Sequence, residues 1–285
     1  MDWARHGANW PHVNASRFVL CKPHKWHVQE MGEGPLLLLI HGAGGATQSW
    51  RHLAPILARD FRVVMIDLPG QGFTKLGAQS RCGLEEMSTD LRALMMQEGL
   101  TPKALIGHSA GAAIALRMAE DLHPAPLVIG INAALGNFKG LAGVLFPIMA
   151  KTLANLPFVA EFFTASTARP KSVERLIDGT GSVLPASDRV FYEQLVSDKA
   201  HVNATLKMMA QWDLDPILAR LDHHPSQTLL ITGDKDRAVP PDTSAKVAKR
   251  VPNAAHVSLP NLGHLAHEED AVAVAEPLLA FLKAS

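Results

Sequence analysis

The sequence is poor in cysteine and has no excess of charge of either sign. Its two cysteines, Cys21 and Cys82, cannot form the disulfide framework of a small secreted domain, so free thiols in a reducing compartment are expected. Lysine plus arginine and aspartate plus glutamate both number 27. This balance argues against nucleic-acid binding and against electrostatic attachment to a membrane, so no nucleic-acid partner is expected.

Long apolar runs are also missing. The longest run, from Gly140 to Ala150, is too short to span a bilayer and contains Pro147. The first residues, Met1 to His6, lack the apolar core of a secretory signal. Together these features predict a soluble cytoplasmic protein.

Sequence motifs for metals and nucleotides are lacking as well. No C-x-x-C or H-E-x-x-H pattern accompanies the 14 histidines, and the pair His223-His224 fits an exposed loop before a proline better than a metal site. The glycine-rich stretch from Gly42 to Gly45 lacks the Lys-Ser/Thr of a phosphate-binding loop and the spacing of a dinucleotide fingerprint. No metal and no cofactor are therefore expected.

What the sequence does contain is an alternation of apolar runs and helical patterns. Strands are predicted at Arg17–Leu20, Lys25–Gln29, Leu36–Ile40, Phe61–Ile66, Ala104–Ile106, Leu127–Ile131, Thr228–Thr232 and His256–Leu259. Helices are predicted at Ser49–Ala58 with Ser49 as its cap, at Leu84–Gln97, from Ala112 to near Leu122, at Asp242–Val251 and at Ala271–Leu282. This order predicts an α/β fold with a mostly parallel, doubly wound sheet.

The pentapeptide Gly107-His108-Ser109-Ala110-Gly111 joins the strand that ends at Ile106 to the following helix. So tight a turn holds Ser109 in a strained backbone conformation, and the flanking glycines let strand and helix approach without a Cβ clash. A G-x-S-x-G sequence between a strand and a helix is typical of the nucleophile elbow of α/β-hydrolases. A G-x-S-x-G sequence by itself is common enough to occur by chance. Its position between a predicted strand and a predicted helix makes it specific, and Ser109 is the candidate nucleophile.

The strand pattern stops between residues 136 and 221, where helical segments rich in Leu, Phe, Met and Ala take its place. In an α/β-hydrolase, a helical cap is commonly inserted after the sixth core strand. We therefore predict a cap over residues 136–221 and an α/β-hydrolase core over residues 1–135 and 222–285.

A serine hydroxyl is a poor nucleophile at neutral pH and needs a general base. The chain order in this fold is Ser, then acid, then His. His264 follows the last predicted strand behind a flexible Gly263, and is preferred as the base. Its rival His267 opens the last helical region and is expected to be structural.

The acid is expected after the preceding strand, where two aspartates occur. Asp236 fits the G-x-x-D-x-x-V-P spacing that starts at Gly233, and its carboxylate would fix the imidazole tautomer. Asp234 is interpreted as a loop-shaping residue. The alternative acid position, after the sixth strand, is occupied by Asn132, which cannot serve as an ionised orienter.

The loop His41-Gly42-Ala43-Gly44-Gly45 supplies the remaining part of the site. In this fold an amide of this loop and the amide of the residue after the nucleophile form the oxyanion hole. Ala110 N–H and Ala43 N–H are assigned to it, with Gly44 as the alternative to Ala43. His41 is interpreted as a brace of the loop.

The predicted cap is rich in large apolar side chains, most of which should pack the cap onto the core. Those that remain over Ser109 would favour a bulky apolar substrate, and any that are exposed would favour contact with a membrane or a partner. The candidate substrate contacts are Trp50, His108, Phe138, Phe146, Phe162 and Trp212.

Over its whole length the chain resembles one subgroup of the α/β-hydrolases, the BchO family of magnesium-chelatase accessory proteins. The matching core stretches are Trp26–Gln29, His41–Arg51, Gly107–Ala115, Asn132–Leu135 and Gly263–Glu269. Two cap stretches, Arg175–Ser182 and Met208–Leu214, carry the specific signal. Two positions depart from the pattern: Gln71 stands where relatives usually have His, and Ala43 stands where many have a hydroxyl residue.

The resemblance implies a role around magnesium insertion into protoporphyrin in a photosynthetic bacterium. It also implies magnesium chelatase subunits as partners, a tetrapyrrole-linked substrate, and a peripheral location at the photosynthetic membrane. Two functions stay open: a serine hydrolase acting on an ester or related acyl bond, or a non-catalytic accessory that holds a porphyrin or docks on the chelatase. The complete set of Ser109, Asp236 and His264 favours the first. A general esterase, a C–C bond hydrolase or a cofactor-free haloperoxidase would use the same triad.

Overall fold

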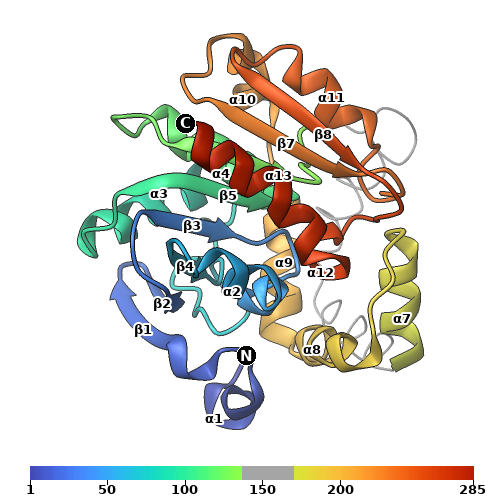
Figure 1. Ribbon diagram of the computed structural model, residues 1–285. Helices are drawn as coiled ribbons and strands as arrows, with labels where there is room; N and C mark the ends of the chain where they lie inside the picture. The colour runs from blue at the N-terminus through green and yellow to red at the C-terminus, as the bar shows by residue number, and fades with distance from the viewer. Residues whose placement is uncertain (137–169) are drawn as a thin grey trace.

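The computed structural model describes residues 1–136 and 170–285. Within these residues, eight strands form one sheet in the order β1-β2-β4-β3-β5-β6-β7-β8 (Figure 1). The strands are β1 Ser16–Cys21, β2 His24–Met31, β3 Leu36–Ile40, β4 Arg62–Ile66, β5 Pro102–His108, β6 Leu127–Ile131, β7 Thr228–Gly233 and β8 Ala254–Leu259. β1, β2 and β4 pair antiparallel, and the pairs from β4 through β8 are parallel. The predicted mostly parallel sheet is confirmed.

The central strands are apolar because helices cover both faces of the sheet. All five residues of β3 are buried, as expected for a strand between two helical layers. One face is covered by α2 Leu53–Leu57, α12 Ala266–Glu269 and α13 Ala271–Ala284, and the other by α3 Leu84–Gln97, α4 Ala110–Glu120 and α11 Asp242–Ala248. The core is therefore split by the sheet into two apolar clusters.

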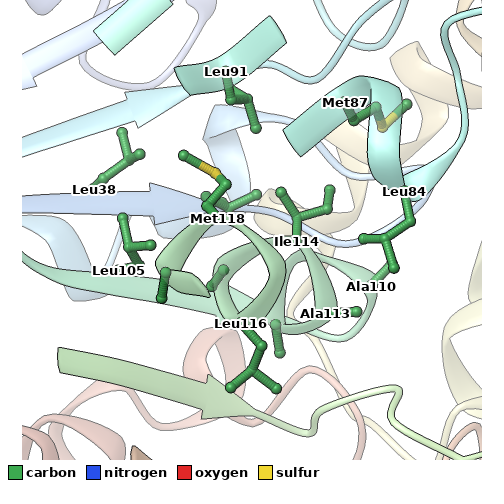
Figure 2. Packing of buried hydrophobic residues seen from close by; sticks show 14 of the residues in the cluster. Leu38, Leu84, Met87, Leu91, Leu105, Ala110, Ala113, Ile114, Leu116 and Met118 are labelled. Carbon is green, nitrogen blue, oxygen red and sulfur yellow. The ribbon is translucent and has the colours of Figure 1, made fainter. Parts of the chain in front are cut away.

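Helix α4 is the central element of one of these clusters. Figure 2 shows Met118 and Ile114 of α4 pointing toward α3, where Leu91 lies, with Leu38 of β3 alongside. Each fully buried side chain of this size contributes about 1.5–3 kcal/mol to folding. The helix that follows Ser109 is thus firmly fixed to the sheet.

The helix predicted at Ser49–Ala58 is wrong in its first half. Residues Thr47–Trp50 form a 3-10 turn, and α2 begins only at Leu53. Ser49 caps nothing, and its buried hydroxyl has no hydrogen-bond partner among the described residues. The reason is that the chain leaves β3 through a tight loop, and the N–H of Thr47 is held by the carboxylate of Asp67 at 2.7 Å.

The described part of the predicted cap, residues 170–221, contains helices and no strand. These helices are α7 Pro170–Gly179, α8 Ala186–Ser197, α9 Lys199–Gln211 and α10 Asp215–Arg220. Figure 1 shows α7, α8 and α9 beyond the carboxyl ends of the central strands. The candidate contacts Phe138, Phe146 and Phe162 lie outside the described residues. None of the helices that can be described is both long and apolar enough to cross a membrane.

Candidate active site

Ser109 lies at the turn between β5 and α4. Its φ of 52° and ψ of −117° place a non-glycine residue in a strained region. A Cβ on Gly107 would lie 2.3 Å from the backbone of Gly111, and a Cβ on Gly111 would lie 2.1 Å from the carbonyl oxygen of Ile40. Only glycine fits at both positions, so the turn has the predicted elbow form and leaves Ser109 half-buried.

His264 and Asp236 meet although 28 residues separate them. The distance from His264 Nδ1 to Asp236 Oδ2 is 2.8 Å. The other carboxylate oxygen, Oδ1, accepts the N–H groups of Ala238 and Val239, both at 2.8 Å. Asp236 is thereby fixed by its own loop, and its role toward the imidazole is that of acceptor. His264 then carries its hydrogen on Nδ1 and leaves Nε2 free to accept a proton.

Asn132 is a part of this site that the sequence did not reveal. It follows β6 with a φ of 47°, and its Nδ2 donates to Asp236 Oδ2 at 2.7 Å and to the Gly263 carbonyl at 3.3 Å. From sequence alone, the position after β6 is an alternative place for the acid. The signal that could have revealed the amide's role is that a side chain there lies next to an acid carried by β7.

His267 and Asp234, the alternatives to His264 and Asp236, do not take part in this hydrogen-bonded pair. His267 is fully buried, and burial, assisted by the positive charge of Arg51, lowers its pKa to about 3. Among the described residues neither ring nitrogen of His267 has a hydrogen-bond partner. Asp234 is exposed, and its Oδ1 accepts the N–H of Asn261 at 2.7 Å. Neither side chain replaces its counterpart in the His264–Asp236 pair.

His108 and Trp50, predicted as substrate contacts, are interior residues. His108 Nε2 donates to the carbonyl oxygen of His264 at 2.8 Å, and burial, together with His267, holds its pKa well below the usual value. Trp50 is fully buried and its ring centroid lies 4.7 Å from that of His267. Trp50 packs in the apolar cluster on one face of the sheet, and His108 packs against the rings of His264 and His267. Trp212 is half-buried at the end of α9 and packs against the core.

A segment of the predicted cap holds the loops that carry Asp236 and His264. The carbonyl oxygen of Thr180 accepts the N–H groups of Arg237, at 3.0 Å, and His264, at 3.3 Å. Ser182 Oγ accepts the N–H of Leu265 at 2.8 Å. Both Thr180 and Ser182 belong to one of the two cap stretches that carry the specific family resemblance, so this stretch contacts the site directly.

A buried ionic network joins α8 to the helix after His264. Arg51 contacts Glu268 at 2.5 Å and Asp188 at 2.7 Å, and the Tyr192 hydroxyl donates to Glu268 Oε1 at 2.5 Å. Burial raises the pKa of Glu268. Burial would also raise the pKa of Asp188, but the positive charge of Arg51 and the contact with His52 hold that pKa below its usual value. The network fixes α12 to the cap.

The loop that carries Ala43, one candidate oxyanion donor, lies against Ser109, and the other candidate, Ala110, follows Ser109 directly. A Cβ on Gly42 would lie 3.0 Å from Ser109 Cβ, so the loop after β3 packs against the nucleophile. Ala110 is the first residue of α4, where a helical N–H lacks a partner within the helix. In the part of the chain that the structure describes, neither Ala110 N–H nor Ala43 N–H donates a hydrogen bond. The N–H of Gly44, the alternative donor, is already bound to Gln71 Oε1 at 2.8 Å.

A second Ser-His-Asp arrangement occurs away from the elbow. His27 Nδ1 lies 2.7 Å from Asp67 Oδ2, and His27 Nε2 lies 3.0 Å from Ser16 Oγ. Ser16 sits on the regular strand β1 and also accepts a hydrogen bond from Gln29. The His27 ring is packed against Trp3, Phe18 and Phe73. We interpret this arrangement as a buried link between β1, β2 and the loop after β4.

The described residues are 1–136 and 170–285. Within these ranges no three His, Cys, Asp or Glu side chains are grouped so that they could hold a metal ion. The chemistry that the described site offers is that of its serine, imidazole, carboxylate and backbone amides.

Comparisons with known proteins show the family and the fold of the chain. The family model for the alpha/beta hydrolase fold matches residues 35–271. An alpha/beta hydrolase fold protein from Burkholderia ambifaria superposes with a TM-score of 0.78 at 23% identity, covering 93% of this chain and 97% of that one, which shows the shared fold. The chain therefore belongs to the α/β-hydrolase family.

Within that family one similarity extends over the full length. The chain is 42% identical over 285 residues to the magnesium-chelatase 30 kDa subunit of Rhodobacter capsulatus, covering 99% of this chain and 100% of the relative. The predicted resemblance to magnesium-chelatase accessory proteins is confirmed. A 2-hydroxy-6-oxo-6-phenylhexa-2,4-dienoate hydrolase of Burkholderia cepacia is 26% identical, with 90% of each chain covered.

Proposed function

We propose that the protein is a serine hydrolase that cleaves an ester or related acyl bond of a bulky apolar substrate. Ser109 is the nucleophile, His264 the general base and acid, and Asp236 the residue that orients the imidazole. The observation that carries the proposal is the 2.8 Å bond from His264 Nδ1 to Asp236 Oδ2, since it leaves Nε2 as the acceptor for the proton of a strained, half-buried serine.

The reaction proceeds by acyl transfer. Ser109 Oγ bonds to the acyl carbon, its proton moves to His264 Nε2, and the carbonyl electron pair moves onto oxygen. The N–H groups of Ala110 and Ala43 stabilise that oxyanion, and one such donor contributes about 2.7–4 kcal/mol to the transition state. The leaving group departs with the proton from His264. Water then attacks the acyl-enzyme by the same route, which releases the acid and restores Ser109.

The biological setting that we propose is bacteriochlorophyll biosynthesis, around magnesium chelatase. The support is the full-length similarity to a relative named as a subunit of that enzyme. A tetrapyrrole or tetrapyrrole-linked ester is the proposed substrate, because such a macrocycle is flat and largely apolar and carries carboxyl groups. Chelatase subunits are the proposed protein partners.

A second candidate function is that of a non-catalytic accessory that binds a porphyrin or docks on the chelatase. The observation that favours it is that the relative with 42% identity is named as a chelatase subunit and not as a hydrolase. Against it stands the complete set of hydrogen bonds around Asp236, since a binding protein does not need an oriented imidazole.

Turnover of p-nitrophenyl esters separates the two functions. The hydrolase should cleave them, with kcat/KM rising at least about tenfold from acetyl to bulky aromatic acyl groups, and Ser109→Ala should abolish turnover. In parallel, protoporphyrin IX is titrated in detergent-controlled buffer, followed by its absorption spectrum. Saturable micromolar binding by a wild-type protein that cleaves no ester would favour the accessory function and contradict the hydrolase.

A further inference from the structure

One face of α9 covers two loops at the site. His201, Ala204, Thr205 and Met208 recur at the spacing of a single helical face. They contact the oxyanion loop, defined as residues 41–45, and the loop after β4, residues 67–74. A Cβ on Gly44 would lie 3.6 Å from Thr205 Cγ2, and a Cβ on Gly70 would lie 2.5 Å from Ala204 Cβ. In Figure 1, α9 lies beside the carboxyl end of β3, where the oxyanion loop begins.

Gly44 is held on both sides of its backbone. Its N–H donates to Gln71 Oε1 at 2.8 Å, and its carbonyl oxygen lies 3.2 Å from His201 Nε2. Its φ of 78° is a left-handed conformation that glycine tolerates. Because Gly44 follows Ala43 directly, these two bonds fix the peptide group next to the candidate oxyanion donor.

His201 is in the tautomer that this contact requires. Its Nδ1 accepts the N–H of Gly72 at 3.0 Å, so the ring hydrogen is on Nε2 and points to Gly44. Burial, together with the positive charge of the Met1 amine, lowers the pKa of His201 to about 4. The imidazole is therefore neutral near pH 7.

Gln71 provides a second connection to α9. It is fully buried, and its Nε2 contacts Met208 Sδ at 3.2 Å while its Oε1 holds Gly44. His41 holds the base of the same loop, because Leu68 N–H donates to His41 Nε2 at 2.9 Å and Nδ1 donates to the Gly42 carbonyl at 2.7 Å. His201 and Gln71 thus connect the oxyanion loop to α9. His41 connects the oxyanion loop to the loop after β4.

We propose that His201 and Gln71 are positioning residues for acyl transfer: they hold Gly44 so that Ala43 N–H points at the oxyanion formed beside Ser109. Full activity then requires α9 to be seated on the oxyanion loop. This inference rests on the proposed hydrolase function and names two residues that act on it through the loop. Neither residue touches the reacting atoms.

The test compares two substitutions that each retain half of the His201 contacts. His201→Gln keeps a donor at the Nε2 position for Gly44, whereas His201→Asn keeps an acceptor at the Nδ1 position for Gly72. Gln71→Leu removes the acceptor for Gly44 N–H at similar volume. His223→Asn is the matched control, since His223 is an exposed histidine at the end of the 3-10 helix Leu221–His223.

Ester hydrolysis gives kcat and KM for each folded variant. Loss of a whole oxyanion donor costs about 10²–10³ in kcat, so a displaced donor should cost roughly 10–100-fold. We expect that fall in His201→Asn and Gln71→Leu, with KM changed less than about threefold, and a loss under about fivefold in His201→Gln. Deuterium exchange of residues 42–45 should accelerate in the two impaired variants.

Unchanged kcat in folded His201→Asn and Gln71→Leu would overturn the inference, as would equal losses in the Gln and Asn variants. If the His201 variants do not fold, Gln71→Leu decides the matter through kcat and exchange. A wild-type protein that cleaves no ester would instead refute the proposed function, and the positioning role with it. The wild type therefore tests the hydrolase function, and the variants test the positioning role.

Discussion

Asn132 donates a hydrogen bond from its side-chain amide to the carboxylate of Asp236, with 2.7 Å between Nδ2 and Oδ2. The same carboxylate oxygen accepts from His264 Nδ1. The side chain after β6 therefore holds Asp236, the proposed acid, which in turn holds the imidazole of His264, the proposed base. This relationship explains why an amide at a position where an acid could stand is compatible with the proposed triad.

Asn132→Ala should lower kcat about tenfold with little change in KM. The physical reason is that a hydrogen bond to a charged group contributes about 1.5–3 kcal/mol, and its loss lets the Asp236 carboxylate rotate. Steady-state ester hydrolysis measures the effect. Asn132→Asp should be at least as damaging, because two carboxyl groups at this distance compete for one proton. Full activity of the Asp variant would contradict the role given to the amide.

The choice within each pair of candidate residues gives a second prediction. Asp236→Asn should reduce turnover by up to roughly 10⁴-fold because it favours the wrong imidazole tautomer, and His264→Ala should be comparably damaging. Asp234→Asn should cost less than about threefold, since Asp234 is exposed and bonds only to a neighbouring loop. His267→Ala should lower the free energy of unfolding, because His267 is fully buried, and should lower kcat far less than His264→Ala does. The reverse ranking would show that the wrong member of each pair is named.

Much of the fold follows from local sequence patterns. The strands at Leu36–Ile40 and Leu127–Ile131 have the predicted bounds, because a fully buried parallel strand is a continuous apolar run between turn residues. The helix predicted from Ser49 failed because the N–H of Thr47, two residues earlier, is bound by Asp67, a contact that no local pattern reveals. Tertiary contact there overrides capping preference.

In the candidate site too, some features follow from local sequence motifs and others depend on tertiary contacts. The tight turn at Ser109 and the contact between His264 and Asp236 are predicted from local motifs, and the structure has both. The choice between Ala43 and Gly44 depends on Gln71, which lies 27 residues from Gly44 and binds its N–H. Trp50 is expected from the sequence to contact the substrate, but its side chain is fully buried. An aromatic residue near a loop of the site packs inward as readily as outward. Only the three-dimensional structure distinguishes these cases.

The cap segment around Ser182 gives a third prediction. Ser182→Ala leaves the buried N–H of Leu265 without its acceptor, which should destabilise the protein by about 1–3 kcal/mol. Because Leu265 follows His264, kcat should also fall, by roughly threefold to tenfold. Urea unfolding and ester hydrolysis measure the two effects. Ser197→Ala, on the exposed end of α8, is the control, and equal behaviour of the two variants would refute the contact's importance.

Buried neutral histidines predict a loss of stability in mild acid. Burial lowers the pKa of His201 to about 4 and that of His267 to about 3, and holds the pKa of His108 well below its usual value. In the unfolded chain each has a pKa near 6.5, so below that pH the unfolded state binds the extra protons. Stability is therefore complete above about pH 6.5 and declines as the pH falls toward the folded-state values.

The expected loss is about 2 kcal/mol for His201 and about 2 kcal/mol for His267 between pH 7 and pH 5. Urea unfolding at half-unit pH steps measures it. His267→Leu removes one titrating group, so the slope of stability against pH should decrease by about 1.2 kcal/mol per pH unit between pH 6 and pH 5. An unchanged slope in that variant would mean that His267 is not held neutral in the folded protein.

The central claim, that Ser109 is an activated nucleophile, is tested most directly by labelling with a fluorophosphonate probe followed by peptide mapping. The account predicts one adduct per chain, on the peptide that contains Ser109, with no labelling of Ser109→Ala and undiminished labelling of Ser16→Ala. Phosphonylation should also slow at least about a hundredfold in His264→Ala. A wild-type protein that stays unlabelled, or an adduct that persists in Ser109→Ala, would contradict the account.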